Sequence, residues 1–407
     1  MIVEADVGLT RNAPAAPAAP ASWSAERSSE ALRDLCQVLF ASLQRSDQRR
    51  RGMDYVRGLI HVEGRKSIRN IASLLGGGQA VEQSLHHFVC DSTWQWDPIR
   101  EALARYVTAA APPLAWVVHP LVILKSGDSS VGVERHASPT SYTQRAVGVW
   151  LASEHTACPV NWRLLLSRSW VEDPLRREQA CIPEQTHPET LGMCAVEASL
   201  RVARGWRLPA RPLLVDAREM DAPAVLGRLR KAGLPQLLRV DGRLRLTVAD
   251  DALRAHNGGQ LSAEEVMRVA APLRRPCLWR APDASPGVRR GTLAAVRVRV
   301  PSPAAGAAAG RQGGELLLLG VAEAGQQWPA ELWLTDAVSL PPIALVQLSR
   351  LMQRVSRDLA EIGDRVGIRD FVGRSFTGWH RHITLASAAH AVAALSRPTA
   401  RQFERAS

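Results

Sequence analysis

The sequence predicts an α+β or α/β protein that combines a helical N-terminal domain with a mixed β-sheet, flanking helices and a β-rich insertion. Two patterns carry this prediction: apolar residues recur at helical spacing over residues 24–111, and short β-type runs begin after Pro112-Pro113. A third is a strand, a helix and a second strand arranged around one acid, Asp216. With 407 residues, the chain can bury a substantial core in two or three domains.

The N-terminal region is predicted to become helical after an extended arm. Residues 1–23 include the run Ala-Pro-Ala-Ala-Pro-Ala-Ala-Pro-Ala, which cannot pack and predicts a disordered arm. Residues 24–111 form the predicted helical domain, a candidate DNA-binding domain, with a break at Gly76-Gly77-Gly78. Pro98 suits the first turn of the last of these helices.

Residues 112–242 are predicted to form the first part of the sheet. A stretch extending to about residue 205 is polar and typical of helices, and the chain then enters a strand that ends at Asp216. A helix over 221–232 and a strand over 236–240 are expected to follow. The strands predicted before the helical stretch are 114–118, 130–134 and 146–152.

Residues 243–338 are predicted to form a β-rich insertion, because strand-like runs alternate there with Gly, Pro and Ala loops such as 301–314. Residues 339–397 should return to the core as helices, and 398–407 form a tail. The strands predicted in the insertion are 293–300, 316–321 and 331–335, and the helices predicted after it are 342–363 and 383–395.

The charge of the chain favours a polyanionic partner. Lys and Arg number 51 against 39 Asp and Glu, which gives a formal net charge of +12 and a sequence pI of about 10.4. Double-stranded DNA is the partner that this balance indicates. The alternative is a compositional bias, because almost all of the basic residues are arginine and GC-rich coding produces the same excess.

Several protein classes are excluded. Charged residues or Gly interrupt every apolar stretch before the roughly 20 residues of a membrane span. The N-terminus has no basic segment followed by an apolar one, so we expect a soluble cytoplasmic protein. Gly76-Gly77-Gly78 lacks the Lys-Ser/Thr ending of a phosphate loop, and no Gly-x-Ser-x-Gly occurs. Six scattered cysteines without a C-x-x-C pair argue against structural zinc.

Residues 367–382 carry a specific motif. Their sequence, Gly-Ile-Arg-Asp-Phe-Val-Gly-Arg-Ser-Phe-Thr-Gly-Trp-His-Arg-His, closely resembles the C-terminal signature of bacterial insertion-sequence DDE transposases. The resemblance covers about residues 50–395 and implies an RNase H-like fold, a DNA partner, a nucleoid-associated location and a homodimer. Further matching segments are Arg65-Lys66-Ser67, His87-Phe88, Trp94 to Pro98, Trp162-Arg163-Leu164, Trp170, Asp173-Pro174, Arg176-Arg177 and Val215-Asp216-Ala217.

The resemblance also implies a catalytic centre of three carboxylates that hold two divalent metals. Two metals about 4 Å apart activate the attacking water and stabilise the leaving oxygen, and shared oxygen ligands must hold them. In this sequence Asp216 is the only matched acid. His119 occupies the first acid position, in Val117-Val118-His119-Pro120, and Ser356 occupies the third.

Neighbouring acids do not replace the two that are missing. The helix that carries Ser356 has Met352 and Gly363 where the family has basic residues. Asp358 and Glu361 lie about 200° and about 140° around this helix from Ser356, so neither points to the same place.

We therefore expect no cofactor and a transposase-derived DNA-binding protein without strand cleavage, either recruited as a regulator or preserved as a decaying copy. One alternative is an active metal-dependent DDE transposase with displaced acids, which would require Mg²⁺. Another is a single metal held by His119 and Asp216, although such a pair is a poor Mg²⁺ site.

Candidate DNA contacts come from two regions. The basic residues Arg65, Lys66 and Arg69 share a helical region, Arg49-Arg50-Arg51 precedes them, and Lys125 lies in the first hairpin. Phosphate contacts by such residues would make binding strongly dependent on salt. The resemblance adds residues of the C-terminal signature, where an H-x-H pair without a third ligand is more often structural than metal-binding. These added candidates are Arg374, Trp379, His380 and Arg381.

Overall fold

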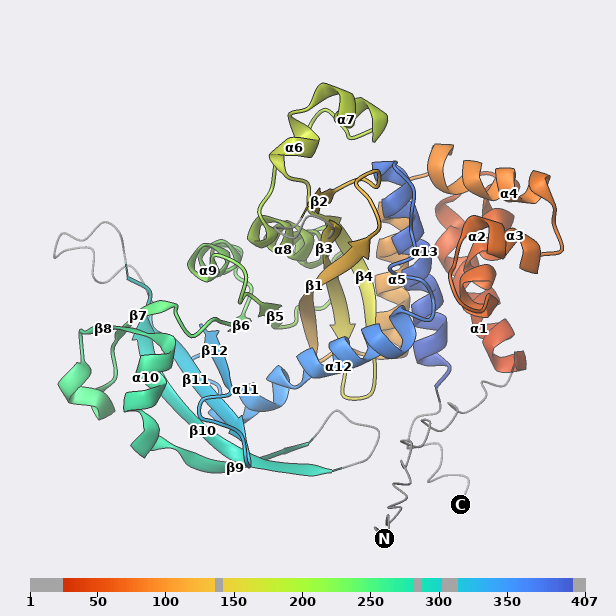
Figure 1. Cartoon of the computed structure of the whole chain (residues 1–407). Coiled ribbons are helices and arrows are strands. Elements are labelled where there is room, and N and C mark those ends of the chain that lie inside the picture. Colours follow the sequence, from red (N-terminus) through yellow and green to blue (C-terminus); the bar gives the residue numbers. More distant parts are fainter. Residues whose placement is uncertain (1–24, 136–141, 281–286, 302–313, 398–407) are drawn as a thin grey trace, which may run out of the picture.

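The computed structural model describes residues 25–135, 142–280, 287–301 and 314–397. The predicted arm and tail, and most of the predicted 301–314 loop, lie outside these ranges. Figure 1 shows a group of helices at one end of the molecule, a β-rich body at the other, and a sheet with its own helices between them. Within the described ranges, no helix combines the length and apolar character needed to cross a membrane.

The first 86 described residues, 25–110, contain helices and no strand. Polar side chains cap the N-termini of some of these helices. Ser67 Oγ, for example, accepts a hydrogen bond from the backbone N–H of Asn70 at 3.2 Å. Three of them pack against the last helix of the chain. The helices are α1 Ala25–Leu39, α2 Ser46–His61, α3 Ile68–Leu74, α4 Gln79–His86 and α5 Trp96–Ala110.

The last helix, α13 Phe376–Leu395, lies at the centre of the molecule. It contacts strand β4 of the sheet and also α1, α2 and α5, so every residue from Gly378 to Ala394 is buried. The helix begins at Phe376 and not at the predicted residue 383, because the Ser375 hydroxyl accepts a hydrogen bond from Gly378 N at 3.1 Å and starts it earlier.

The central sheet confirms the predicted fold class. Its strand order is β4-β3-β1-β5-β6, in which β3 is antiparallel to β1 and β4, while β5 and β6 run parallel to β1. This order and these directions are those of the RNase H-like fold. The strands are β1 Ala115–Lys125, β2 Val133–Arg135, β3 Tyr142–Ala152, β4 Ala157–Leu164, β5 Leu213–Asp216 and β6 Gln236–Arg239.

Strand β4 was not among the predicted strands. Its residues are buried on both faces, so the sequence lacks the alternation of a half-buried strand. It also contains Pro159, which pairs with Trp150 where the register with β3 shifts. A proline at an irregularity is compatible with a strand, but it weakens the sequence signal. The predicted strand 130–134 is reduced to the short β2, which pairs with the start of β3.

Four helices follow the first strands. Thr190 and Asp221 cap the N-termini of α8 and α9. Their side-chain oxygens accept hydrogen bonds from backbone N–H groups of the first turn, at 3.2 and 3.0 Å. Helix α8 packs on β3 and β4, and α9 packs on β6. The four are α6 Arg168–Val171, α7 Pro174–Gln179, α8 Leu191–Leu200 and α9 Ala222–Lys231.

The β-rich body extends the central sheet. Its last strand pairs antiparallel with β6, with Leu334 opposite Leu238, so one sheet of 12 described strands runs through both bodies. The capping box of Ser262 and Glu265 begins its helix. The elements are β7 Arg245–Val248, β8 Gln260–Ser262, α10 Ala263–Val269, β9 Arg275–Arg280, β10 Val288–Arg299, β11 Leu316–Glu323 and β12 Glu331–Thr335.

Two helices return the chain to the central sheet. The predicted helix 342–363 is divided at Arg350 into α11 Pro342–Ser349 and α12 Leu351–Asp358, and a π turn over Leu359–Gly363 continues it. Helix α12 packs against β1, β3 and β4. It therefore places its side chains beside β1, the strand that contains His119.

Candidate active site

Three elements bring His119, Asp216 and Ser356 together; we call these residues the candidate centre. Strands β1 and β5 are parallel neighbours in which Val118 pairs with Val215, so the next residue of each strand, His119 or Asp216, lies beside the other. Helix α12 crosses β1 and supplies Ser356, whose Oγ lies 3.1 Å from His119 Nε2. Ser356 Oγ also donates to Met352 O at 3.1 Å.

The single carboxylate of the candidate centre is held by an arginine from its own strand end. Arg218 Nε donates to Asp216 Oδ1 at 2.8 Å, and Arg218 Nη2 donates to Oδ2 at 2.6 Å. Burial would raise the pKa of Asp216, but the hydrogen bonds and charge of Arg218, with the charge of Arg239, hold it below its ordinary value. Asp216 is therefore ionised at neutral pH, and each of its oxygens accepts a hydrogen bond from Arg218.

The imidazole of His119 is neutral at pH 7. Burial lowers its pKa; the charge of Asp216 opposes this shift, and the charges of Arg369 and Arg218 add to it. A neutral ring and a hydroxyl thus occupy the two positions where the family resemblance implies carboxylates. The candidate centre contains one negative charge, with a guanidinium bound to it.

The nearby acids of α12 and its π turn point to other partners. Asp358 is buried, and its Oδ2 accepts a hydrogen bond from Ala157 N at 2.7 Å, while Arg354 and Arg397 lie within 3.7 Å of its carboxylate. Glu361 pairs with Arg357 at 2.7 Å and with Arg397 at 3.2 Å. Neither acid supplies an oxygen to the candidate centre.

A pair of divalent ions does not fit the residues present. Two shared ions require several oxygen ligands, whereas the candidate centre has one carboxylate, and the cationic guanidinium of Arg218 already takes a lone pair on each of its oxygens. In the part of the chain that the structure describes, no group of three or more His, Cys, Asp or Glu residues could hold a metal ion. The arrangement can position charge and accept hydrogen bonds.

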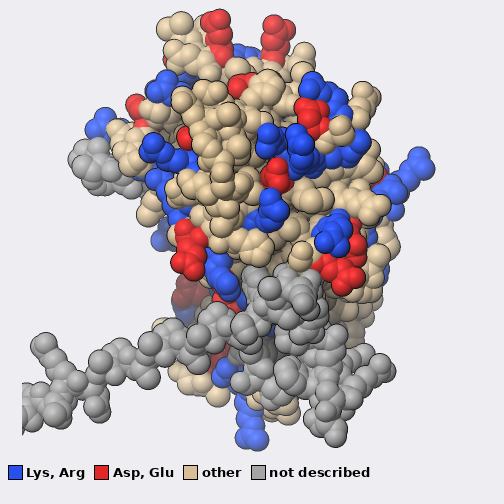
Figure 2. All heavy atoms as spheres, turned by 90° about the vertical axis from the view of Figure 1, so that its right-hand side faces the viewer, with Lys and Arg blue, Asp and Glu red and all other residues tan. Residues whose placement is uncertain are grey.

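Three of the predicted DNA contacts are exposed. Arg65 and Arg69 lie at the surface of the N-terminal helices, and Arg374 lies just before α13. Figure 2 shows the face that these helices present, where basic side chains are spread among fewer acidic ones. Arg65 and Lys125 also line a surface cavity of about 720 Å³ together with Arg369. Lys125 is half-buried, and its Nζ donates to Phe371 O at 2.5 Å.

The structure corrects four other predicted contacts, because their side chains are buried. Lys66 donates its Nζ to Val62 O within its own turn. Trp379 is 1% exposed, and Arg381 donates to backbone carbonyls that include Trp94 O at 3.1 Å. His380 stacks on Trp96, with ring centroids 4.7 Å apart. His380 and Arg381 join α13 to the N-terminal helical region, while Trp379 Nε1 donates to Gln144 Oε1 of β3 at 3.2 Å, so in this arrangement none of the four reaches a duplex.

The H-x-H pair of the C-terminal signature is also structural. His382 Nδ1 bonds the hydroxyl of Tyr55 at 2.9 Å, and its Nε2 lies 2.8 Å from Gly367 O. His380 Nδ1 lies 3.1 Å from the guanidinium of the buried Arg100. Both rings are therefore engaged by the protein.

Sequence reasoning missed Arg218 and Arg369. Arg218 follows Asp216 by two residues, a spacing at which a side chain can fold back onto the carboxylate after the strand has ended. Arg369 lies inside the C-terminal signature and acts on His119 through its charge. The two-residue spacing between Asp216 and Arg218 was the one sequence signal for their contact. It indicates that contact only when the residue at which the strand ends is known.

The order of the strands and the position of the candidate centre define a protein with the architecture of RNase H-like nucleases. The chain belongs to the family of DDE superfamily endonucleases, which residues 38–302 match. A solved structure described as the piggyBac transposase synaptic complex with hairpin DNA is similar over 92% of this chain and 72% of that chain, with a TM-score of 0.37 and 10% sequence identity. No curated protein matches the sequence.

Proposed function

We propose that this DDE superfamily chain binds double-stranded DNA and does not cleave it. The observation that carries the proposal is the composition of the candidate centre: His119 and Ser356 bond each other, and Arg218 binds both oxygens of Asp216. A guanidinium thus neutralises the carboxylate where a cleaving enzyme of this architecture would use cations.

The chemistry of cleavage supports this choice. Hydrolysis of a phosphodiester by two metals requires an activated water on one side and a stabilised leaving oxygen on the other. His119 is neutral and Ser356 is a hydroxyl, so neither supplies the anionic oxygen that a hard cation prefers. A metal at Asp216 would compete with Arg218, whose positive charge is already held there by a charge-assisted bidentate pair.

The binding half of the proposal rests on charge. The net charge of +12 favours association with the phosphate backbone, and Arg65, Arg69 and Arg374 are exposed and available for contacts. Each phosphate neutralised steepens the salt dependence of binding by about 0.9 in a plot of log affinity against log salt. DNA affinity of this protein should therefore fall steeply as salt rises.

The role that we propose for such binding is regulation at DNA sites by a recruited transposase-like protein of insertion-sequence origin, acting as a homodimer at the nucleoid. The packed core supports retained use, because the central sheet, α13 and the N-terminal helices form one continuous apolar cluster. Sequencing of the genomic DNA recovered with the tagged protein tests this role. Discrete recovered sites support it, and uniform recovery contradicts it.

A nicking assay tests the proposed absence of cleavage. Full-length protein is incubated with supercoiled plasmid in Mg²⁺ or Mn²⁺, while a gel-shift on the same DNA measures binding. The expected result is a salt-sensitive shift with no nicked product, and Asp216→Ala should behave like the wild type. Nicking that Asp216→Ala abolishes would establish the alternative, an active metal-dependent endonuclease.

A further inference from the structure

Strands β9 and β10 form a two-stranded ribbon at the edge of the β-rich body (Figure 1). They are antiparallel from the pair Val288 and Arg280 to the pair Leu293 and Arg275. Strand β9 lies off the main strand order and pairs with β10. The ribbon is therefore an edge of the sheet.

The two faces of the ribbon differ. Residues directly opposite each other in an antiparallel pair point to the same face, and the face alternates along each strand. Trp279 lies on the inner face: it is 3% exposed, and Arg350 Cζ lies 5.1 Å from the centre of its ring. The outer face carries five exposed side chains, which are Pro276, Leu278, Arg280, Val288 and Arg290.

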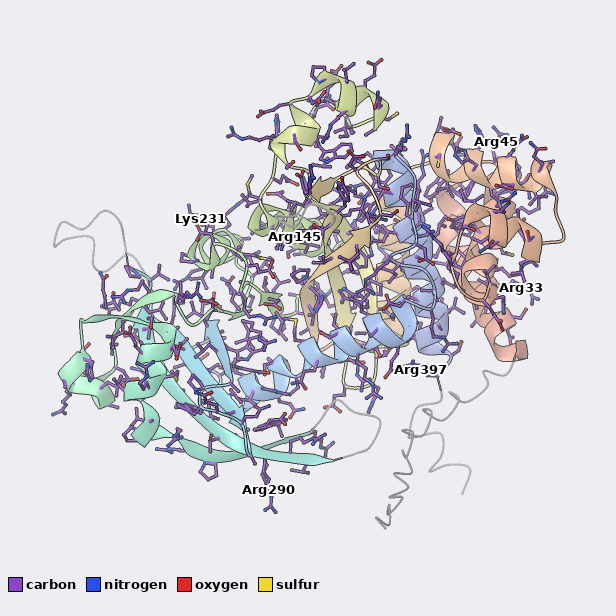
Figure 3. The ribbon with its side chains drawn as sticks, viewed as in Figure 1. Arg33, Arg45, Arg145, Lys231, Arg290 and Arg397 are labelled. Carbon is purple, nitrogen blue, oxygen red and sulfur yellow. The ribbon has the colours of Figure 1, made fainter. Side chains whose placement is uncertain are left out.

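The outer face combines positive charge with apolar surface. Leu278 is 57% exposed and Val288 is 65% exposed. Among the residues that the structure describes, neither Arg280 nor Arg290 has a carboxylate within 4.0 Å, and β9 and β10 contain no acid. Arg290 extends away from the ribbon into open space (Figure 3).

The other end of β10 shows a different arrangement. Arg297 and Arg299 lie 4.0 and 3.8 Å from the carboxylate of Glu315. The strand therefore has one end at which arginines are paired with an acid and another at which the outer face, among the residues that the structure describes, carries arginines without an acidic partner. An exposed face with unbalanced positive charge favours a polyanionic partner, and two copies of it facing each other would bring like charges together.

We propose that this ribbon enters the major groove of duplex DNA, an inference that rests on the proposed function of DNA binding. The major groove, about 12 Å wide, admits a two-stranded β-ribbon. Arg280 and Arg290 contact phosphates or the acceptor atoms of guanine, while Leu278 and Val288 contact the thymine methyl groups that line the groove. The ribbon is then a DNA-contacting element separate from the candidate centre and from the N-terminal helices.

The first test removes the two outer arginines. Binding of the full-length protein to a random-sequence duplex is measured over a salt series for wild type, Arg280→Ala/Arg290→Ala and the control Arg297→Ala/Arg299→Ala. Loss of two phosphate contacts should lower the salt slope by about 1.8 and weaken binding about tenfold, while the control binds like wild type. Equal effects of the two double variants would overturn the proposal, because the loss would then follow net charge alone.

The second test identifies the groove. Bulky groups on C5 of the pyrimidines project into the major groove, so wild type should bind a duplex that carries them at least tenfold more weakly than the plain duplex. The Arg280→Ala/Arg290→Ala variant should discriminate less. Equal wild-type affinity for both duplexes would overturn the proposal.

The outcomes separate this inference from the proposed function. If wild type binds no duplex, DNA binding itself is refuted. If wild type binds DNA and Arg280→Ala/Arg290→Ala binds equally well, only the ribbon is refuted. If that variant instead changes the sedimentation of the protein without changing DNA affinity, the ribbon is an interface between copies and the proposal is again overturned.

Discussion

Arg218 binds Asp216 through two parallel hydrogen bonds of 2.8 and 2.6 Å, at the end of the strand where the architecture places a catalytic acid. Asp216 is 10% exposed at its side chain, while Arg218 is half-exposed. The guanidinium therefore covers the carboxylate from the solvent side. This pair, together with the bond between His119 and Ser356, is the basis of the proposal that the candidate centre does not bind a pair of metal ions.

Replacing Arg218 with Ala should destabilise the protein by about 1–3 kcal/mol at pH 7, because it leaves a buried carboxylate unpaired. The pKa of Asp216 is lowered in the folded state, so the stabilisation is present above the ordinary pKa and is lost as pH falls through the lowered value. Urea unfolding at a series of pH values should show that the difference in unfolding free energy between wild type and Arg218→Ala becomes smaller at acid pH. The control is Arg145→Ala, whose partner Glu219 is 70% exposed, with an expected loss below about 1 kcal/mol. Equal losses of stability in Arg218→Ala and Arg145→Ala would contradict the stabilising role assigned to the Arg218–Asp216 pair.

DNA affinity should be the same in Mg²⁺ and in EDTA at matched ionic strength. The reason is that Arg218, and not a divalent ion, neutralises Asp216. Fluorescence anisotropy with a labelled duplex measures this directly. A gain of tenfold or more in Mg²⁺ that Asp216→Ala removes would show that an ion joins the complex.

The protein should lose stability as the pH falls from about 6.5 toward 4. Burial lowers the pKa of His382 to about 4 and that of His390 to about 3, so both rings stay neutral in the folded protein while the unfolded chain binds protons. Each such ring contributes a slope of about 1.4 kcal/mol per pH unit. His382→Gln should reduce the slope of unfolding free energy against pH by about that amount. If unfolding free energy changed with pH in the same way for wild type and His382→Gln, the prediction that His382 stays neutral in the folded protein would be contradicted.

Arg100→Ala should destabilise the protein by about 3 kcal/mol or more. Arg100 is buried, and its guanidinium joins α5 to β4 and α13 by donating to Asn161 Oδ1 at 3.1 Å, Trp162 O at 2.8 Å and Thr384 Oγ1 at 2.7 Å. Removal leaves buried acceptors unpaired and opens a cavity. Arg105→Ala on the exposed side of the same helix is the control, with an expected loss of about 0.5 kcal/mol. Thermal unfolding of both variants checks the difference.

The sequence predicted most of the RNase H-like core, because most of its signals are local. The apolar run that leads to His119 and the short strand that ends at Asp216 both form strands, and these are paired in the parallel direction. The helix around Ser356 forms as well. Strand β4 escaped prediction because Pro159 and burial on both faces remove the pattern that identifies a strand.

Side-chain placement was less predictable than the strands. Trp379, His380 and Arg381 belong to a polar-looking motif, but α13 passes between the sheet and the N-terminal helices and is buried all round. That burial depends on the packing of segments far apart in the sequence, such as Arg100 and His380, which are 280 residues apart, and no local pattern encodes it. The contact between Arg218 and Asp216 is short in sequence, but its geometry depends on where β5 ends.

The most direct test of the account is a crystal of the protein bound to duplex DNA, soaked in MnCl₂ and measured at an energy where manganese scatters anomalously. We predict no anomalous peak within about 2.5 Å of the Asp216 carboxylate, with Arg218 still bound to both of its oxygens. Two peaks about 4 Å apart that share Asp216 as a ligand, with Arg218 displaced, would contradict the loss of cleavage.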